Sequence, residues 1–303
     1  MIMGFLQSHL GEMAALTTAL CWTFNSMAFE AAGKKVGSLS VNYLRLFVAF
    51  PLLTITALIT RGLPFPTDAT GRTWLFLLIS GLIGFVLGDI FLFQAYVEIG
   101  SRTSLLIVSM APPITALAGF LIMGESISPL GLLGMVATMF GISLVILSRN
   151  PQEKKIKLNR PLKGIAYAFL GAMGQAFGLI FSKLGMGSYN PLAATQIRLV
   201  AAFVAFTIII TLRKKWPEIR AAIHHKKAVG QIAIGAILGP YFGVTFALVA
   251  LQNTEAGIVS SITAMSPVLI IPFAILVFKE KVLPKEILGA LISILGVILL
   301  FLR

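Results

Sequence analysis

Two stretches of the sequence, Met110–Gly141 and Met265–Gly296, decide the fold because they are versions of one pattern. The first reads MAPPITALAGFLIMGESISPLGLLGMVATMFG and the second reads MSPVLIIPFAILVFKEKVLPKEILGALISILG. Aligned without a gap at a shift of 155 residues, they share a Met, two Pro, a Glu and two Gly at equivalent positions. Such self-similarity indicates that the chain is built from repeated structural units.

The repeat continues toward the N-terminal end of each half. A shift of 153 residues places Arg45 on Arg198 without a gap, and two further residues enter the loop before the third apolar segment. The sequence therefore predicts two repeats, residues 1–150 and residues 151–303.

The composition indicates that both repeats lie in a membrane. Hydrophobic residues make up 57% of the chain, charged residues only 12%, and the mean hydropathy is +0.95. A transmembrane helix needs roughly 20 apolar residues, and ten such segments recur along the chain. They span residues 11–31, 42–60, 73–96, 103–123, 129–148, 163–184, 192–212, 229–251, 257–278 and 284–302.

Five spans in each half is an odd number, so the second half has to enter the membrane from the side opposite to the first. The predicted fold is an all-α integral membrane protein with ten transmembrane helices in two inverted five-helix repeats. Many secondary transporters use inverted repeats to alternate access around a site near the midplane.

The same residues resemble a known family. The Pro in the fourth span of each half, the Glu at its end (Glu125 and Glu280) and the Gly-rich fifth span are similar to EamA repeats of the drug/metabolite transporter superfamily. The early CWTFN and the Arg of NYLRLFVAF are similar to the opening of that repeat. The resemblance implies a ten-helix carrier with a central cavity that usually exports amino acids, other metabolites or drugs.

The basic residues predict the orientation. Most of the 24 Lys and Arg residues fall in the odd-numbered loops between predicted spans, whereas only Arg61, Arg72, Lys183 and Arg303 lie in the termini and the even-numbered loops. The positive-inside rule then places the odd loops in the cytoplasm and both termini outside. The expected location is the plasma (inner) membrane, crossed many times.

Polar residues inside the spans are the candidate lining of a cavity, because a polar side chain that faces lipid is unfavourable. Trp22 and Asn25 share a helical face in the first span, and the repeat maps Trp22 onto Gln175. Similar faces occur in the third and eighth spans. The alternative is that these side chains pack helices against each other. The candidate residues are Trp22, Asn25, Asp89, Tyr96, Gln175, Tyr241 and Thr245.

Asp89 is the carboxylate placed furthest inside a span, and three interpretations compete for it. It is a buried structural acid bonded to a neighbouring helix, a proton-coupling group, or an anchor for a cationic substrate. The equivalent position in the second half is Val244, so only the first half carries a carboxylate at this position.

Arg45 and Arg198 have two interpretations. They extend to the membrane interface as long basic side chains do near helix ends, or they contact a substrate anion or neutralise an intramembrane acid.

Several classes of function lack a signal. A single cysteine and three histidines offer no metal-binding pattern, and no Walker loop or hydrolase motif occurs. We expect no metal, no cofactor, no nucleic-acid partner and no enzyme activity. The expected function is a secondary transporter of a small organic solute, in the export direction and with protons as a possible coupling ion. The alternatives are an intramembrane enzyme and a lipid- or solute-binding membrane scaffold.

Overall fold

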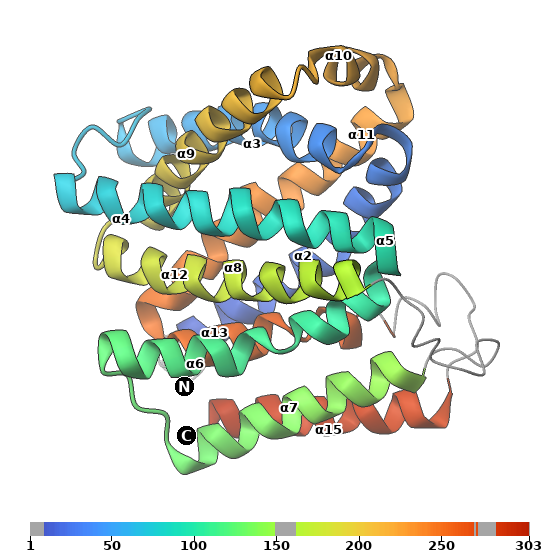
Figure 1. The fold of residues 1–303 in the computed structure, drawn as a ribbon. Helices are drawn as coiled ribbons and strands as arrows, with labels where there is room; N and C mark the ends of the chain where they lie inside the picture. Colours follow the sequence, from blue (N-terminus) through green and yellow to red (C-terminus); the bar gives the residue numbers. More distant parts are fainter. Residues whose placement is uncertain (1–8, 149–161, 270, 272–282, 303) are drawn as a thin grey trace.

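The structure is a computed structural model that describes residues 9–148, 162–269, 271 and 283–302. Throughout these residues the regular elements are helices, and the described part contains no strand (Figure 1). This confirms the prediction of an all-α protein. Glu280 and the end of the ninth predicted span lie outside the described residues.

The first half of the chain forms seven labelled helical elements, counted within the described residues. They are α2 (Leu10–Val36), α3 (Ser38–Arg61), α4 (Gly71–Gly81), η1 (Leu82–Gly88), α5 (Asp89–Val108), α6 (Ala111–Met123) and α7 (Pro129–Ser148). The second half forms α8 (Leu162–Met186), α9 (Pro191–Leu212), α10 (Trp216–His224), α11 (Lys226–Ala236), η2 (Ile237–Gly243), α12 (Val244–Asn253), α13 (Ala256–Thr263) and α15 (Pro284–Phe301).

Six helical stretches in the described residues are long and apolar enough to cross a membrane. They are Ser38–Arg61, Gly71–Tyr96, Leu162–Met186, Pro191–Leu212, Lys226–Asn253 and Pro284–Phe301. Shorter apolar helices occur at Ala111–Met123, Pro129–Val145 and Ala256–Leu269. The first predicted span lies within α2, which carries Glu12 and Glu30 and is less apolar. The chain is therefore a multi-pass membrane protein, while the count of ten spans stays a prediction.

Two π-helical segments interrupt long helices at equivalent places. η1 has the sequence LIGFVLG and η2 has the sequence ILGPYFG, and the two are 155 residues apart. A π-helical turn carries an extra residue and is frequent at functional sites. In η2, Pro240 has no N–H to donate to the helical ladder.

Two breaks in the fourth and ninth spans are also 155 residues apart. Turns at Ser109–Met110 and Ala264–Met265 separate the helical segments before and after them. Pro112 and Pro267 lie in the first turn of the helical segments that follow, where a missing N–H is tolerated. The two halves thus depart from regular helix at the same positions of the repeat. Their inversion relative to the membrane stays a prediction.

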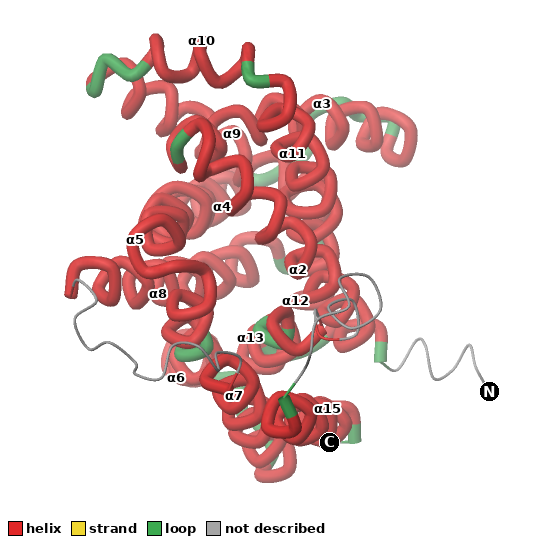
Figure 2. Tube along the Cα trace, turned by 90° about the vertical axis from the view of Figure 1, so that its right-hand side faces the viewer, coloured by secondary structure: helices red, strands yellow, loops and turns green. Residues whose placement is uncertain are grey.

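The main helix contacts join one half to the other (Figures 1 and 2). Helices α4 and α5 pack against α8, and the equivalent α11 and α12 pack against α2. The remaining pairs are α3 with α9, α6 with α13 and α7 with α15. The repeat exchanges the first two contacts and maps the pairs α3 with α9 and α7 with α15 onto themselves, as expected for halves related by a two-fold axis. Helix α13 corresponds instead to the end of α5, and the equivalent of α6 begins after the turn at Ala264–Met265.

Small residues permit close crossings between the helices. A Cβ on Gly178 of α8 would lie 2.9 Å from the Cα of Gly84 in η1. At the equivalent crossing, a Cβ on Gly239 of η2 would lie 2.3 Å from Nδ2 of Asn25 in α2. Asn25 is the repeat equivalent of Gly178. One half therefore brings a polar amide into a crossing that the other half makes with glycines.

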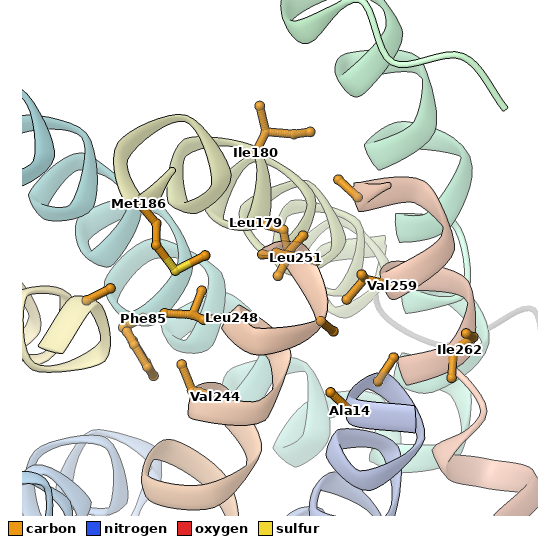
Figure 3. Packing of buried hydrophobic residues seen from close by; sticks show 14 of the residues in the cluster. Ala14, Phe85, Leu179, Ile180, Met186, Val244, Leu248, Leu251, Val259 and Ile262 are labelled. Atoms are coloured by element: carbon orange, nitrogen blue, oxygen red, sulfur yellow. The ribbon is translucent and has the colours of Figure 1, made fainter. Parts of the chain in front are cut away.

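Buried apolar side chains surround the centre of the bundle. Phe85, Leu179, Val244 and Leu248 belong to the largest cluster and come from η1, α8 and α12 (Figure 3). Three of these, Phe85, Leu179 and Val244, also line the cavity described next.

Candidate functional site

A cavity of about 150 Å³ lies at the centre of the bundle and is lined by both halves of the chain. It is bordered by the two π-helical segments and by the two broken helices. Seven of the nine residues proposed from the sequence line it, namely Trp22, Asn25, Arg45, Asp89, Tyr96, Gln175 and Arg198. The tertiary structure therefore brings together side chains from five separate predicted spans.

Arg45 is buried beside the cavity and forms an ion pair with Asp89. Its side chain is 4% exposed and that of Asp89 is 15% exposed. The guanidinium carbon also lies 5.2 Å from the ring centre of Phe93 and 5.5 Å from that of Phe85. This position is not that of a side chain extended to the interface. It favours the interpretation that Arg45 neutralises an intramembrane acid.

The same ion pair bears on the three interpretations of Asp89. A carboxylate that already accepts from Arg45 fits the structural interpretation. A cationic substrate would have to displace Arg45 from it, so the pairing counts against an anchor for cations.

Arg198 is also buried beside the Phe85 ring, and it forms no ion pair with a carboxylate of the described residues. It is 6% exposed, and its guanidinium carbon lies 4.8 Å from the centre of the Phe85 ring. Within the described residues it forms no hydrogen bond or ion pair, and its Nε is a buried atom without a partner. A Cβ on Gly84 would lie 3.2 Å from Nη2 of Arg198, so a glycine there leaves room for the guanidinium.

Tyr241 and Thr245, the two remaining candidates, lie outside the cavity lining. The Tyr241 hydroxyl is 2.8 Å from that of Thr56, and the Thr245 hydroxyl donates to the Tyr241 carbonyl at 2.6 Å. The helical face that contains them was inferred from regular α-helical spacing. The neighbouring face of the same span, with Pro240, Val244 and Ala247, lines the cavity instead.

Hydroxyl groups at the helix breaks also line the cavity, although they are not among the residues proposed from the sequence. Ser109, Ser260, Thr263 and Ser266 line the cavity. Ser266 donates to the backbone carbonyl of Ala19 at 3.1 Å and so joins the broken ninth span to α2. The signal in the sequence was the proline that follows each break, because an interrupted helix exposes polar groups that need partners.

A polar cluster ties the two halves together at the end of the bundle where α12 meets α13. Lys183 at the end of α8 lies 2.6 Å from Oε1 of Glu125 and donates to the carbonyl of Thr254 at 2.5 Å. Oε2 of Glu125 accepts from the backbone N–H of Ala256 at 3.0 Å. The loop after α6 is thereby fixed to the connection between α12 and α13.

A second hollow of about 490 Å³ lies between α3, α10 and α11. Its lining includes Tyr43, Phe47, Trp216 and Ile223, and Arg220 is its one charged lining residue among those described. It is larger than the central cavity, but it combines no set of polar groups from the two halves. The central cavity is the better candidate for a functional site.

Comparisons with known proteins agree with this architecture. The sequence model of the EamA-like transporter family matches twice, at residues 9–147 and 162–302. A protein of Archaeoglobus fulgidus described as an uncharacterized transporter is 22% identical over 298 residues, covering 96% of this chain and 97% of its own. A solved crystal structure with 16% identity has a TM-score of 0.75 over 95% of each chain. At that identity the likeness concerns the fold.

Proposed function

The chain belongs to the EamA-like transporter family, and we propose that it is a secondary transporter that moves a small organic solute through the central cavity by alternating access. The transport step is directed outward across the plasma membrane, as the family resemblance implies. Amino acids, other metabolites and drugs are the classes of solute to test first.

One observation carries this proposal: buried charged and polar side chains from both halves line a single cavity inside an apolar bundle. Charged groups within membrane-spanning segments are unfavourable, so they tend to mark substrate or ion pathways. A site built at the interface of two repeats is also where rocking of the halves changes access.

The irregular helices supply places where such movement can occur. The π-helical segments η1 and η2 and the turns at Ser109–Met110 and Ala264–Met265 all border the cavity. In this proposal the contacts of Glu125 with Lys183 and Ala256 hold the end near Thr254 closed in one of the two states. In the opposite state these ties would separate and the other end would close.

Proton coupling depends on Asp89, which is the one carboxylate among the described residues that line the cavity. A proton-coupled cycle would load its proton there and release Arg45 from the ion pair. A double variant that removes both Arg45 and Asp89 tests this coupling.

The test of transport uses purified protein in liposomes that contain no other protein. A thermal-shift screen of amino acids, nucleosides and cationic drugs first selects solutes that stabilise the folded state. We then expect saturable counterflow of a labelled solute, in which unlabelled solute inside drives uptake from outside. Chemical conversion of the solute would indicate an enzyme, and binding without counterflow would indicate a scaffold.

A matched pair of variants ties the counterflow to the cavity. Gln175→Phe places a ring in the lining, and we expect it to abolish most counterflow at normal protein yield. Ile208→Phe on the exposed, lipid-facing side of α9 is the control, because Ile208 is 52% exposed and outside the cavity. Equal counterflow in both variants would remove this cavity from the transport path.

A further inference from the structure

We propose that the solute is a small organic anion, a monocarboxylate with an apolar or aromatic body, and that Arg198 is the residue that binds its carboxylate. This inference rests on the proposed function, because it names the class of solute that the same cavity takes. It narrows the expectation to compounds that carry a negative charge and no ammonium group.

The charged residues that line the cavity do not balance. Arg45 and Arg198 occupy equivalent positions in the two halves, and both line the cavity. The position that holds Asp89 in the first half holds Val244 in the second, and Val244 also lines the cavity. Two arginines therefore share one carboxylate, and the described lining has one positive charge in excess.

The excess positive charge lies on Arg198. Asp89 forms its ion pair with Arg45. Arg198 is left in contact with the face of Phe85 and the space beside Gly84, and its Nε has no partner. A charge buried in an apolar region is strongly unfavourable unless it is paired. Asp89 is close enough to attract Arg198, but its carboxylate is already engaged with Arg45. An anionic ligand is the partner that would compensate it.

The lining and the volume of the cavity indicate the shape of the ligand. Trp22, Phe85, Phe93 and Tyr96 line the cavity. A volume of about 150 Å³ holds roughly one six-membered ring. The single excess charge matches a monoanion, and arginine binds a carboxylate through two parallel N–H donors.

Cations and zwitterions fit these surroundings less well. An ammonium group would enter a cavity that is already positive, and the one lining carboxylate is engaged with Arg45. An amino acid would satisfy Arg198 with its carboxylate but leave its ammonium group without a partner. We therefore expect a carboxylate to bind more tightly than the amino acid of the same size.

The experiment measures binding to the full chain in a detergent with an uncharged headgroup. Thermal unfolding is titrated with 3-phenylpropanoate, with its amide, with 3-phenylpropylamine and with phenylalanine. We expect the carboxylate to raise the Tm with a saturable dependence, the amide and the amine to leave it unchanged, and phenylalanine to act only at higher concentration. Inorganic phosphate and phosphatidylglycerol are separate arms that test a free inorganic anion and a lipid headgroup.

Three variants assign the effect to Arg198. In Arg198→Gln we expect the affinity for 3-phenylpropanoate to fall roughly 10- to 100-fold, as for loss of a charged hydrogen-bonded partner. Val244→Asp supplies the missing carboxylate, and we expect a loss of similar size with Arg198 still present. Arg72→Gln, at the exposed start of α4, is the control and should bind as the unchanged protein does.

The outcomes separate the inference from the proposed function. Equal stabilisation by the amine, the same affinity in Arg198→Gln, or no effect of the carboxylate would each overturn the anion assignment, as would a stronger effect of phosphate or phosphatidylglycerol. Arg198→Gln should fold, because it only removes a charge that has no ion-pair partner among the described residues. If Val244→Asp does not fold, the affinity of Arg198→Gln for 3-phenylpropanoate decides the assignment. Carboxylate binding without counterflow would instead refute transport and leave the binding site intact.

Discussion

At the scale of single residues, the two arginines of the repeat show how one sequence position acquires two roles. Both lie over the Phe85 ring, but Arg45 forms an ion pair with Asp89, whereas Arg198 forms no ion pair with any residue that the structure describes. The difference arises at one other position, where the first half has Asp89 and the second half has Val244. This one difference between the repeats leaves two arginines and one carboxylate among the described residues that line the cavity.

We predict that Asp89→Asn lowers the free energy of unfolding by about 3 kcal/mol, because it leaves Arg45 buried without its partner. The double variant Arg45→Gln, Asp89→Asn should recover most of this loss, since it removes both charges. Thermal unfolding in detergent measures both. Equal stability of Asp89→Asn and the unchanged protein would show that the ion pair contributes nothing to the fold.

The double variant also tests proton coupling. If Asp89 carries the coupling proton, liposomes with the double variant still exchange solute but no longer accumulate it in response to a pH gradient. Full pH-driven accumulation in that variant would exclude Asp89 as the coupling group.

At the scale of helices, glycines set how closely α8 approaches η1. A Cβ on Gly174 would lie 2.5 Å from the Cα of Gly88, which is backbone and cannot move aside as a flexible side chain can. Gly230 in α11 is the matched contrast, because a Cβ there would meet nothing within 4 Å. The same substitution should therefore have opposite effects at the two sites.

We predict that Gly174→Ala destabilises the protein by about 1–3 kcal/mol through overpacking. Gly230→Ala should stabilise it by about 0.5–1 kcal/mol, because alanine restricts the unfolded chain at an open helical site. Thermal unfolding of the two variants checks both signs. A neutral Gly174→Ala would mean that η1 and α8 separate easily, against the close crossing described above.

The contacts of Glu125 with Lys183 and Ala256 make a second prediction for the helices. Glu125→Gln weakens the tie between the loop after α6 and the end of α8, so the cavity should open more often toward that end. A cysteine at Ser260, in a Cys21→Ser background, reports this as faster alkylation by a membrane-impermeant reagent.

Glu218→Gln provides the control for that measurement, since Glu218 pairs with Lys215 at the exposed start of α10. Its alkylation rate should equal that of the unchanged protein. A rate in Glu125→Gln that does not exceed the control would show that the tie does not restrict access.

At the scale of the whole molecule, the charge distribution predicts how the bundle lies in the membrane. Ser188 precedes α9 and His225 follows α10, and both are exposed. Each can be replaced by a single cysteine. With Cys21 replaced by Ser, we expect the cysteine at 188 to react with an impermeant reagent in intact cells and the cysteine at 225 to be protected. The reverse pattern would place the termini in the cytoplasm.

The sequence by itself determined the class of structure and the internal repeat. Apolar runs of membrane-spanning length require helices, because the backbone has to satisfy its own hydrogen bonds in lipid. The shift of 155 residues read from Met110 and Met265 also places η1 on η2, although nothing in the residue pattern indicated a π-helical turn. The equivalent arginines and the unmatched Asp89 were likewise visible in the sequence.

Only the tertiary structure decided which of these groups meet. Tyr241 and Thr245 lie outside the cavity lining, and Pro240 and Val244 line it instead, because helix packing decides which face of the eighth span turns toward the cavity. Arg45 pairs with Asp89, and Arg198 forms no ion pair within the described part of the chain, because pairing depends on how α3, α5 and α9 pack across the two halves. A sequence records which charges a membrane protein contains, but their neutralisation depends on distances between helices that are far apart along the chain.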